Sequence, residues 1–216
     1  MKSPGPDSQI WKLASRLAGL PVIRKIVEPK LFIWKMRGKP LPAPPKIKQG
    51  IVRSYLKDFG LDTLIETGTY RGDMIKALEA DVSQVFSVEL DGKLQKRAVR
   101  RFRRNSGIRI LQGDSSELLP KIIKEARGPA LFWLDAHYSG GLTAKGDVET
   151  PILRELAIVL GRDNPGDVIL IDDAREFVGK NDYPTIDQLK DFVSSVSPKS
   201  ALTVAMDIIR IVRVPV

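Results

Sequence analysis

Helical segments and apolar strand segments alternate from residue 49 to the end of the chain, and this alternation restricts the fold more than any other feature of the sequence. The segment Val168-Ile169-Leu170-Ile171 is apolar at every position, which is typical of a parallel sheet covered by helices on both faces. The last two strand segments are too close for a crossover helix, so they should form an antiparallel pair. We therefore expect an α/β fold with a mostly parallel seven-stranded sheet, with helices over 49–59, 73–80, 92–104, 115–126, 149–160 and 184–196, and strands over 62–67, 84–90, 108–112, 130–135, 167–172, 201–206 and 208–214.

Composition and charge separate the first 50 residues from the rest. The 216 residues are 43% hydrophobic, which suits one domain plus an extension. Residues 1–50 contain 11 lysines and arginines and only 2 acidic residues, whereas residues 51–216 contain 24 of each, so the net charge of +9 lies in the extension. The chain has no cysteine, which excludes disulfides and thiolate catalysis and agrees with a cytoplasmic protein.

The N-terminal extension has the pattern of short amphipathic helices. Apolar residues recur at helical spacing over 8–20, a second piece covers 22–28, and Trp11 and Trp34 lie among basic residues. Two interpretations remain open for residues 1–40: peripheral contact with a membrane surface, or an arm packed on its own domain or on a second copy of the chain. No apolar run is long enough to cross a membrane, and the pattern of a signal peptide is absent. A proline-rich linker over 38–48 should separate a basic helical extension, 1–48, from a domain over 49–216.

The stretch 64–72, Leu-Ile-Glu-Thr-Gly-Thr-Tyr-Arg-Gly, runs from an apolar strand through a glycine turn into a helix. Gly68 and Gly72 allow a ligand to lie against the main chain, although their spacing is not that of a dinucleotide fingerprint or a phosphate loop. Glu89 ends the next strand, where a carboxylate can accept both hydroxyls of a ribose, and Asp114 ends the one after, where it could take an adenine amino group. Taken singly, each acid could instead cap a helix or lie on the surface.

With these residues, 51–216 resembles the Rossmann-like class I S-adenosylmethionine-dependent methyltransferases, and within them the metal-dependent O-methyltransferases of the catechol and macrocin types. The resemblance implies that Glu66, Gly68 and Gly72 form the methionine end of the cofactor site, Glu89 binds ribose and Asp114 faces adenine. Tyr70 stands where many members have a middle glycine, and this departure narrows the turn. The full set of expected cofactor residues is Glu66, Gly68, Thr69, Tyr70, Gly72, Glu89, Asp114, Ser115 and Asp135; Ser115 is also a candidate cap of the helix over 115–126.

Two further groups of residues are candidates for the chemistry. Asp135, Asp172 and Asp173 end strands that should be adjacent, and their oxygens suit Mg²⁺ or another hard divalent cation; the alternative is that Asp172 or Asp173 caps the following loop. His137 is the only histidine and follows Asp135 on a glycine-rich loop, so it is a candidate base together with Asp135, or else a structural residue. The loop over 138–147 contains Tyr138, Thr143 and Lys145, and its glycines are typical of a lid.

A basic run over 93–104 suggests nucleic-acid binding. Its cations, however, lie opposite an apolar stripe formed by Leu94, Ala98 and Phe102, so we expect an ordinary solvated helix face.

Taken together, the strand-end residues and the resemblance predict an S-adenosylmethionine-dependent methyltransferase that acts on a hydroxyl of a small molecule or glycan. Two alternatives remain: an RNA methyltransferase that uses the basic helix, and a non-catalytic membrane-surface or assembly protein with the same fold.

Overall fold

The computed structural model describes residues 29–135, 151–162 and 164–213, and the chain divides into two compact units, 1–40 and 41–216. In the first unit, helix α2 (Pro29–Met36) is followed by a turn in which the Trp34 indole N–H donates to the Pro40 carbonyl at 2.7 Å. The helices predicted over 8–20 and 22–28 lie outside the described residues. None of the helices in the described part of the chain combines the length and the apolar character that crossing a membrane would need.

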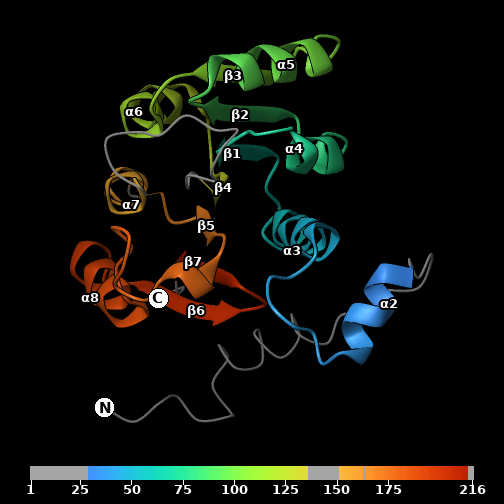
Figure 1. Ribbon diagram of the computed structural model, residues 1–216. Helices are drawn as coiled ribbons and strands as arrows, with labels where there is room; N and C mark the ends of the chain where they lie inside the picture. The colour runs from blue at the N-terminus through green and yellow to red at the C-terminus, as the bar shows by residue number, and fades with distance from the viewer. Residues whose placement is uncertain (1–28, 136–150, 163, 214–216) are drawn as a thin grey trace. The chain divides into compact units, whose positions relative to one another are not determined.

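The second unit is built on one seven-stranded sheet with the order β3-β2-β1-β4-β5-β7-β6 (Figure 1). Five strands run parallel to one another: β1 (Thr63–Thr67), β2 (Gln84–Glu89), β3 (Ile108–Gln112), β4 (Leu131–Leu134) and β5 (Val168–Ile171). Strand β7 (Ile208–Arg213) runs antiparallel between β5 and β6 (Ser200–Ala205). This topology confirms the predicted mostly parallel sheet with an antiparallel end, and it places the carboxyl ends of β1 to β5 along one edge.

Helices pack on both faces of the sheet. Helix α7 (Ile152–Leu160) packs between α6 (Ser115–Glu125) and α8 (Ile186–Val196) on one face, while α3 (Pro45–Asp58) contacts α4 (Asp73–Leu78) and β4. Helix α5 (Gly92–Phe102) packs against β2 and β3. A short 3₁₀ turn, η1 (Ala174–Glu176), follows β5.

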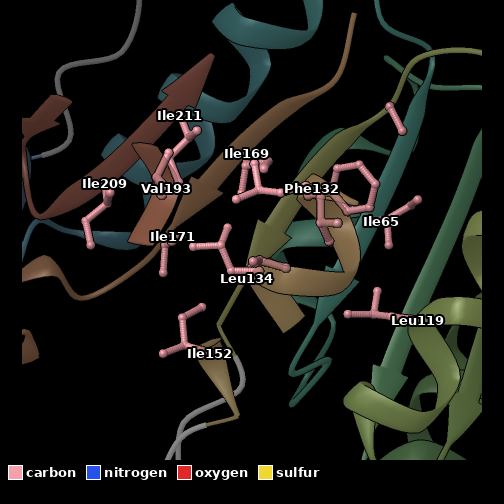
Figure 2. Close-up of a cluster of buried hydrophobic side chains, with 14 of the residues drawn as sticks. Ile65, Leu119, Phe132, Leu134, Ile152, Ile169, Ile171, Val193, Ile209 and Ile211 are labelled. Atoms are coloured by element: carbon pink, nitrogen blue, oxygen red, sulfur yellow. The ribbon is translucent and has the colours of Figure 1, made fainter. Parts of the chain in front are cut away.

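The main hydrophobic core lies under α6, α7 and α8 (Figure 2). Ile65, Phe132, Ile169 and Ile211 are register partners across four neighbouring strands, so their side chains form one continuous buried row. Every position of β1, β4 and β5 is buried, because helices cover both faces there.

The linker predicted over 38–48 is helical from Pro45 onward, so this part of the prediction is wrong. Pro45 lies in the first turn of α3, where its fixed φ suits a helix and its missing N–H has no intrahelical partner to lose. Helix α3 then buries Lys48, Val52, Tyr55 and Leu56 on one face. Lys48 therefore lies on a packed helix and not in an extended linker.

Gly72, at the start of α4, provides a test of how tightly the turn after β1 is packed. Its φ is +73°, and a Cβ there would lie 2.6 Å from Cε2 of Phe102. Gly60 has a similar φ of +63° but open space around a Cβ. We expect Gly60→Ala to cost about 1 kcal/mol of unfolding free energy from backbone strain, and Gly72→Ala to cost roughly 1–3 kcal/mol more because Phe102 must move. Urea denaturation of both variants measures the difference, and equal losses would show that Phe102 does not restrict this turn.

Candidate functional site

The turn between β1 and α4 is held by backbone hydrogen bonds to the neighbouring strand. The N–H groups of Gly68 and Thr69 both donate to the Val88 carbonyl, at 3.0 and 3.1 Å. Gly68 has a φ of +84°, and Tyr70 adopts a left-handed φ of +48°, which is a conformation that glycine reaches at lower cost. The Tyr70 side chain is therefore carried on a glycine-like backbone and remains exposed.

Glu89 is fixed at the end of β2 by main-chain donors on both of its oxygens. Oε2 accepts the Tyr70 N–H at 2.7 Å, and Oε1 accepts the Asp91 N–H at 3.0 Å. Burial raises the pKa of Glu89, although these two N–H groups act in the opposite direction. Main-chain donors thus orient the carboxylate before any ligand arrives.

Glu66 lies under the same turn and is only 2% exposed. Its Oε2 accepts a hydrogen bond from the Ser87 hydroxyl at 2.5 Å, and Ser87 lies in turn 2.6 Å from the Thr69 hydroxyl. Burial, together with the charges of Asp135 and Glu89, raises the pKa of Glu66 to about 8, against the lowering effect of Ser87. Glu66 is therefore mostly protonated at neutral pH and joins the strand ends of β1 and β2 into one polar network.

Asp114 is the cap of α6. Its Oδ1 accepts the Ser116 N–H at 2.7 Å and the Ser116 hydroxyl at 2.6 Å. Ser115 was the candidate cap in the sequence, and that prediction is wrong: Ser115 is the first helical residue and is buried. Capping uses one oxygen of Asp114, so the second remains for the predicted adenine contact.

Glu155 is a buried acid that sequence reasoning missed. It lies on α7, is fully buried, and its Oε2 is 3.4 Å from the Thr67 hydroxyl. Its Oε1 has no hydrogen-bond partner among the described residues. Burial raises the pKa of Glu155 to about 7, opposed by the hydroxyls of Ser115 and Thr67 and assisted by the charges of Asp114 and Asp135. Its position inside the predicted helix over 149–160 was visible, but a helical period alone does not indicate which strand end it faces.

Asp135, Asp172 and Asp173 come together at the ends of β4 and β5. Each offers a carboxylate oxygen, and these oxygens lie within 4.8 Å of one another. Their hydrogen bonds continue the sheet, since the Asp135 N–H donates to Thr67 and the Asp172 N–H donates to Leu134. The oxygen donors match those that a hard divalent cation prefers. We call these three residues the aspartate cluster.

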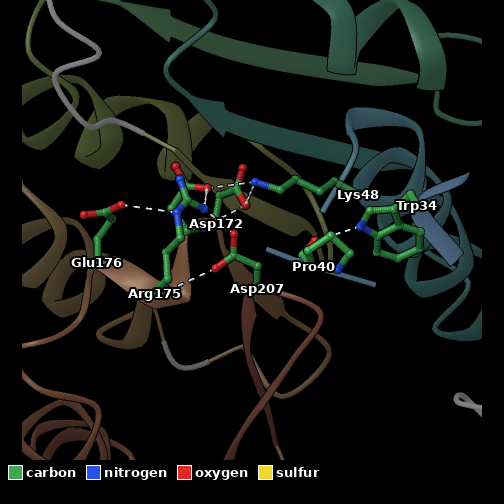
Figure 3. Close-up of polar contacts among 8 residues, drawn as sticks. Trp34, Pro40, Lys48, Asp172, Arg175, Glu176 and Asp207 are labelled. Carbon is green, nitrogen blue, oxygen red and sulfur yellow. Dashed lines mark hydrogen bonds and ion pairs between the residues drawn. The ribbon is translucent and has the colours of Figure 1, made fainter. Parts of the chain in front are cut away.

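Two cations of the protein contact the aspartate cluster (Figure 3). The Lys48 ammonium lies 2.5 Å from Oδ1 of Asp172 and 2.8 Å from Oδ1 of Asp173. Arg175, on η1, donates to Oδ1 of Asp173 at 2.8 Å and also pairs with Asp207 in the turn before β7. Sequence reasoning missed Lys48 because the proline-rich linker seemed to include it; the signal was its helical spacing with Val52 and Tyr55.

Electrostatics of the cluster show an excess of negative charge. Burial alone would lower the pKa of Lys48, but the charges and hydrogen bonds of Asp172 and Asp173 outweigh it and raise the pKa. Burial, then the charges of Asp135 and Asp173, raises the pKa of Asp172 to about 7, although Lys48 acts in the opposite direction. Lys48 therefore stays protonated, and its single positive charge offsets only part of the negative charge of the aspartate cluster.

Four residues of the predicted catalytic loop lie outside the described residues: His137, Tyr138, Thr143 and Lys145. On α5, Leu94, Ala98 and Phe102 are buried, which confirms the predicted stripe. Opposite that stripe the basic side chains are exposed: Lys93, Lys96, Arg97, Arg100, Arg101, Arg103 and Arg104.

Comparison with solved structures identifies the fold as that of the class I methyltransferases, as the sequence resemblance implied. An O-methyltransferase from Bacillus cereus, solved in complex with SAH (S-adenosylhomocysteine), matches with a TM-score of 0.59 and 18% identity, over 89% of this chain and 94% of that one. A methyltransferase from Podospora anserina, also SAH-bound, matches with a TM-score of 0.58 and 13% identity, over 100% and 99% of the two chains.

An RNA enzyme is also among the similar structures. A 23S rRNA methyltransferase matches with a TM-score of 0.51 and 15% identity, over 81% of this chain and 70% of that one. No protein-family model and no curated protein matches the sequence. At these identities the similarities establish the fold.

The raised pKa of Glu66 predicts how stability changes with pH. Because Glu66 is neutral in the folded protein up to about pH 8 but ionises near pH 4.5 when unfolded, its contribution is complete below about pH 4.5 and is lost as the pH rises to about 8. Glu66→Gln keeps an acceptor for Ser87 but cannot ionise. We expect wild type to lose roughly 1–3 kcal/mol more unfolding free energy than Glu66→Gln between pH 5 and pH 8.

Urea denaturation across this pH range measures the effect, and Glu117→Gln, at an exposed position of α6, is the control. Parallel stability curves for wild type and Glu66→Gln would show that the buried carboxyl is already ionised in the folded state.

Proposed function

We propose that the chain is an S-adenosylmethionine-dependent methyltransferase that methylates a hydroxyl of a small molecule or glycan. The observation that carries this proposal is Glu89, whose two oxygens are fixed by the Tyr70 and Asp91 N–H groups at the end of β2. A ribose presents two adjacent hydroxyl donors, which an oriented carboxylate can accept together. The fold supports the same conclusion, since similar structures were solved with SAH.

In this proposal the cofactor lies along the carboxyl edge of the sheet, from β3 to β4. The turn with Gly68, Thr69, Tyr70 and Gly72, above Glu66, receives the methionine end, because its glycines let a ligand approach the main chain. The start of α6, with Asp114 and Ser115, lies beside the adenine, and Asp135 lies toward the methyl group. The electrostatic influence of Asp135 and Glu89 on Glu66, and of Asp114 and Asp135 on Glu155, supports one shared site at this edge.

S-adenosylmethionine supplies an electrophilic methyl group on a positively charged sulfur. The acceptor oxygen forms the new C–O bond as the S–C bond breaks, and the breaking pair of electrons returns to sulfur to give a neutral thioether. The hydroxyl proton is transferred to a base, for which His137 and Asp135 are our candidates. The chain contributes mainly by holding donor and acceptor in line.

Two features bear on the acceptor. Similar structures include several O-methyltransferases, and this supports a hydroxyl acceptor. The exposed basic face of α5 and the similarity to an rRNA methyltransferase favour RNA as the second candidate. Arg101 of that face already pairs with Asp73, and the helix has the solvated face expected of an ordinary surface helix, so we favour the small-molecule acceptor.

Cofactor binding through Glu89 can be tested by calorimetry with SAH and its 2′-deoxy and 3′-deoxy analogues. Because the carboxylate accepts charged hydrogen bonds from the ribose, we expect Glu89→Ala to weaken SAH binding by roughly 10- to 100-fold. We also expect at least one deoxy analogue to bind wild type less tightly than SAH does, and this difference to vanish in Glu89→Ala, since the two changes remove the same contact.

Asp191→Asn, at an exposed position on α8, is the matched control and should bind like wild type. Undiminished SAH binding by Glu89→Ala would contradict the ribose assignment. A loss of affinity for a deoxy analogue that persists in full in Glu89→Ala would assign Glu89 a role in supporting the turn instead.

The acceptor class can be tested by methyl transfer from labelled S-adenosylmethionine to phenol, sugar and macrolide libraries and to RNA. We expect hydroxyl-bearing small molecules to be labelled, and His137→Ala and Asp135→Ala to reduce turnover by about 10²-fold or more, the usual effect of losing a positioned acid or base. Normal turnover in both variants would remove them as catalytic residues. Labelling of RNA alone, weakened by high salt, would favour the second candidate.

A further inference from the structure

We infer that Lys48 occupies the cation position of the aspartate cluster, so that the methyl transfer proposed above needs no divalent metal. The inference rests on the proposed function only for its consequence in catalysis. The Lys48 ammonium, carried by α3, is the counterion of Asp172 and Asp173, and its Nζ lies 2.5 and 2.8 Å from their Oδ1 atoms. The oxygens of the predicted metal site therefore lie together, but a lysine of the same chain already binds two of the three aspartates.

Donors of the protein occupy one carboxylate oxygen of Asp172 and one of Asp173 in the aspartate cluster. Oδ1 of Asp172 accepts Lys48 and also the Asp173 N–H, at 2.8 Å. Oδ1 of Asp173 accepts both Lys48 and Arg175, each at 2.8 Å. A carboxylate oxygen has two lone pairs, so both Oδ1 atoms are saturated by protein donors. A metal bound through them would have to displace Lys48.

Burial makes that displacement unfavourable. The side chains of Lys48, Asp172 and Asp173 are 11%, 7% and 9% exposed. Mg²⁺ requires near-octahedral geometry and retains several of its waters, which the buried carboxylates of Asp172 and Asp173 would have to accommodate. An ammonium carries three donors of its own and needs no bound water to satisfy its two aspartates.

Lys48 is also held in place before any ligand binds. It lies on α3, whose Val52, Tyr55 and Leu56 are buried against the sheet, so the backbone that carries the ammonium is fixed. Arg175 is fixed independently, because its N–H and guanidinium both contact Asp207. Two cations of the same chain, Lys48 and Arg175, thus hold the aspartate cluster in place.

In a reaction without a metal, a base of the protein accepts the proton of the acceptor hydroxyl. Without a metal to lower the pKa of the acceptor hydroxyl, a side chain that accepts the hydroxyl proton during methyl transfer supplies the acid–base catalysis. Lys48, as a charged ammonium, is not that base. It is a positioning residue that keeps Asp172 and Asp173 in place.

The inference can be tested by titrating Mn²⁺ and Mg²⁺ into wild type, Lys48→Ala and Lys48→Met, followed by calorimetry and by the unfolding temperature. Removing the ammonium leaves buried carboxylates without their counterion, and a metal can then take its place. We expect Mn²⁺ to bind both variants at least about tenfold more tightly than wild type, and to raise their unfolding temperature but not that of wild type. Lys48→Arg should behave like wild type.

Two controls make the result specific. Lys57→Ala removes an exposed lysine from the same helix and should not increase metal binding. Adding Asp172→Asn to Lys48→Ala should abolish the gained binding. The inference is overturned if wild type binds Mn²⁺ as tightly as Lys48→Ala, or if neither neutral variant gains binding. Tight, saturable binding of Mn²⁺ by wild type overturns the inference even where a variant fails to fold.

These titrations need neither cofactor nor acceptor, so they are separate from the SAH calorimetry that tests the proposed function. With an acceptor in hand, excess EDTA should leave wild-type turnover unchanged. Turnover abolished by EDTA and restored by Mg²⁺ would overturn the inference while leaving the methyltransferase proposal intact.

Discussion

Concentrating carboxylates at one edge of a buried sheet is the constraint on which the rest of this structure depends. Removing an ionised carboxylate from water is costly unless it is paired, hydrogen-bonded or protonated. The chain uses all three solutions at once: Glu89 receives two main-chain donors, Asp172 and Asp173 receive Lys48, and Glu66 is mostly protonated at neutral pH. The parallel topology creates the problem, because it directs five strand ends to the same edge.

The two ends of the proposed site differ in how they are held. Around Glu89 the donors are backbone N–H groups of the turn after β1 and of the start of α5, so this end is determined by local chain geometry. Around Asp173 the donors are side chains from α3 and η1, which are more than a hundred residues apart in sequence. The surroundings of Glu89 are therefore built by the continuous segment from β1 to the start of α5, whereas the aspartate cluster requires elements from the whole domain.

This difference explains what the sequence could and could not predict. The sheet, its antiparallel end and the acids at the strand ends follow from apolar runs and from the rule that parallel strands share an edge. Lys48 was missed because two adjacent prolines resemble a linker, although a proline in the first turn also favours a helix. Glu155 and Asp207 were missed because their importance comes from tertiary contacts that no local period reports. Asp114 showed the alternative role foreseen for it, as a helix cap, and Ser115 did not.

A lysine ammonium and a divalent metal repel each other when both lie in one cluster of carboxylates, and the size of this repulsion favours one cation at a time. At an effective dielectric constant of about 20, two unit charges about 4 Å apart interact by roughly 4 kcal/mol, and a divalent ion doubles that repulsion. The same aspartates would attract the metal. The lysine, however, is covalently attached to the chain, so it loses no translational freedom by binding from solution. Since Arg175 also remains next to Asp173, a metal would meet two fixed cations at once. The packed helix α3 thus places an internal cation, Lys48, beside Asp172 and Asp173.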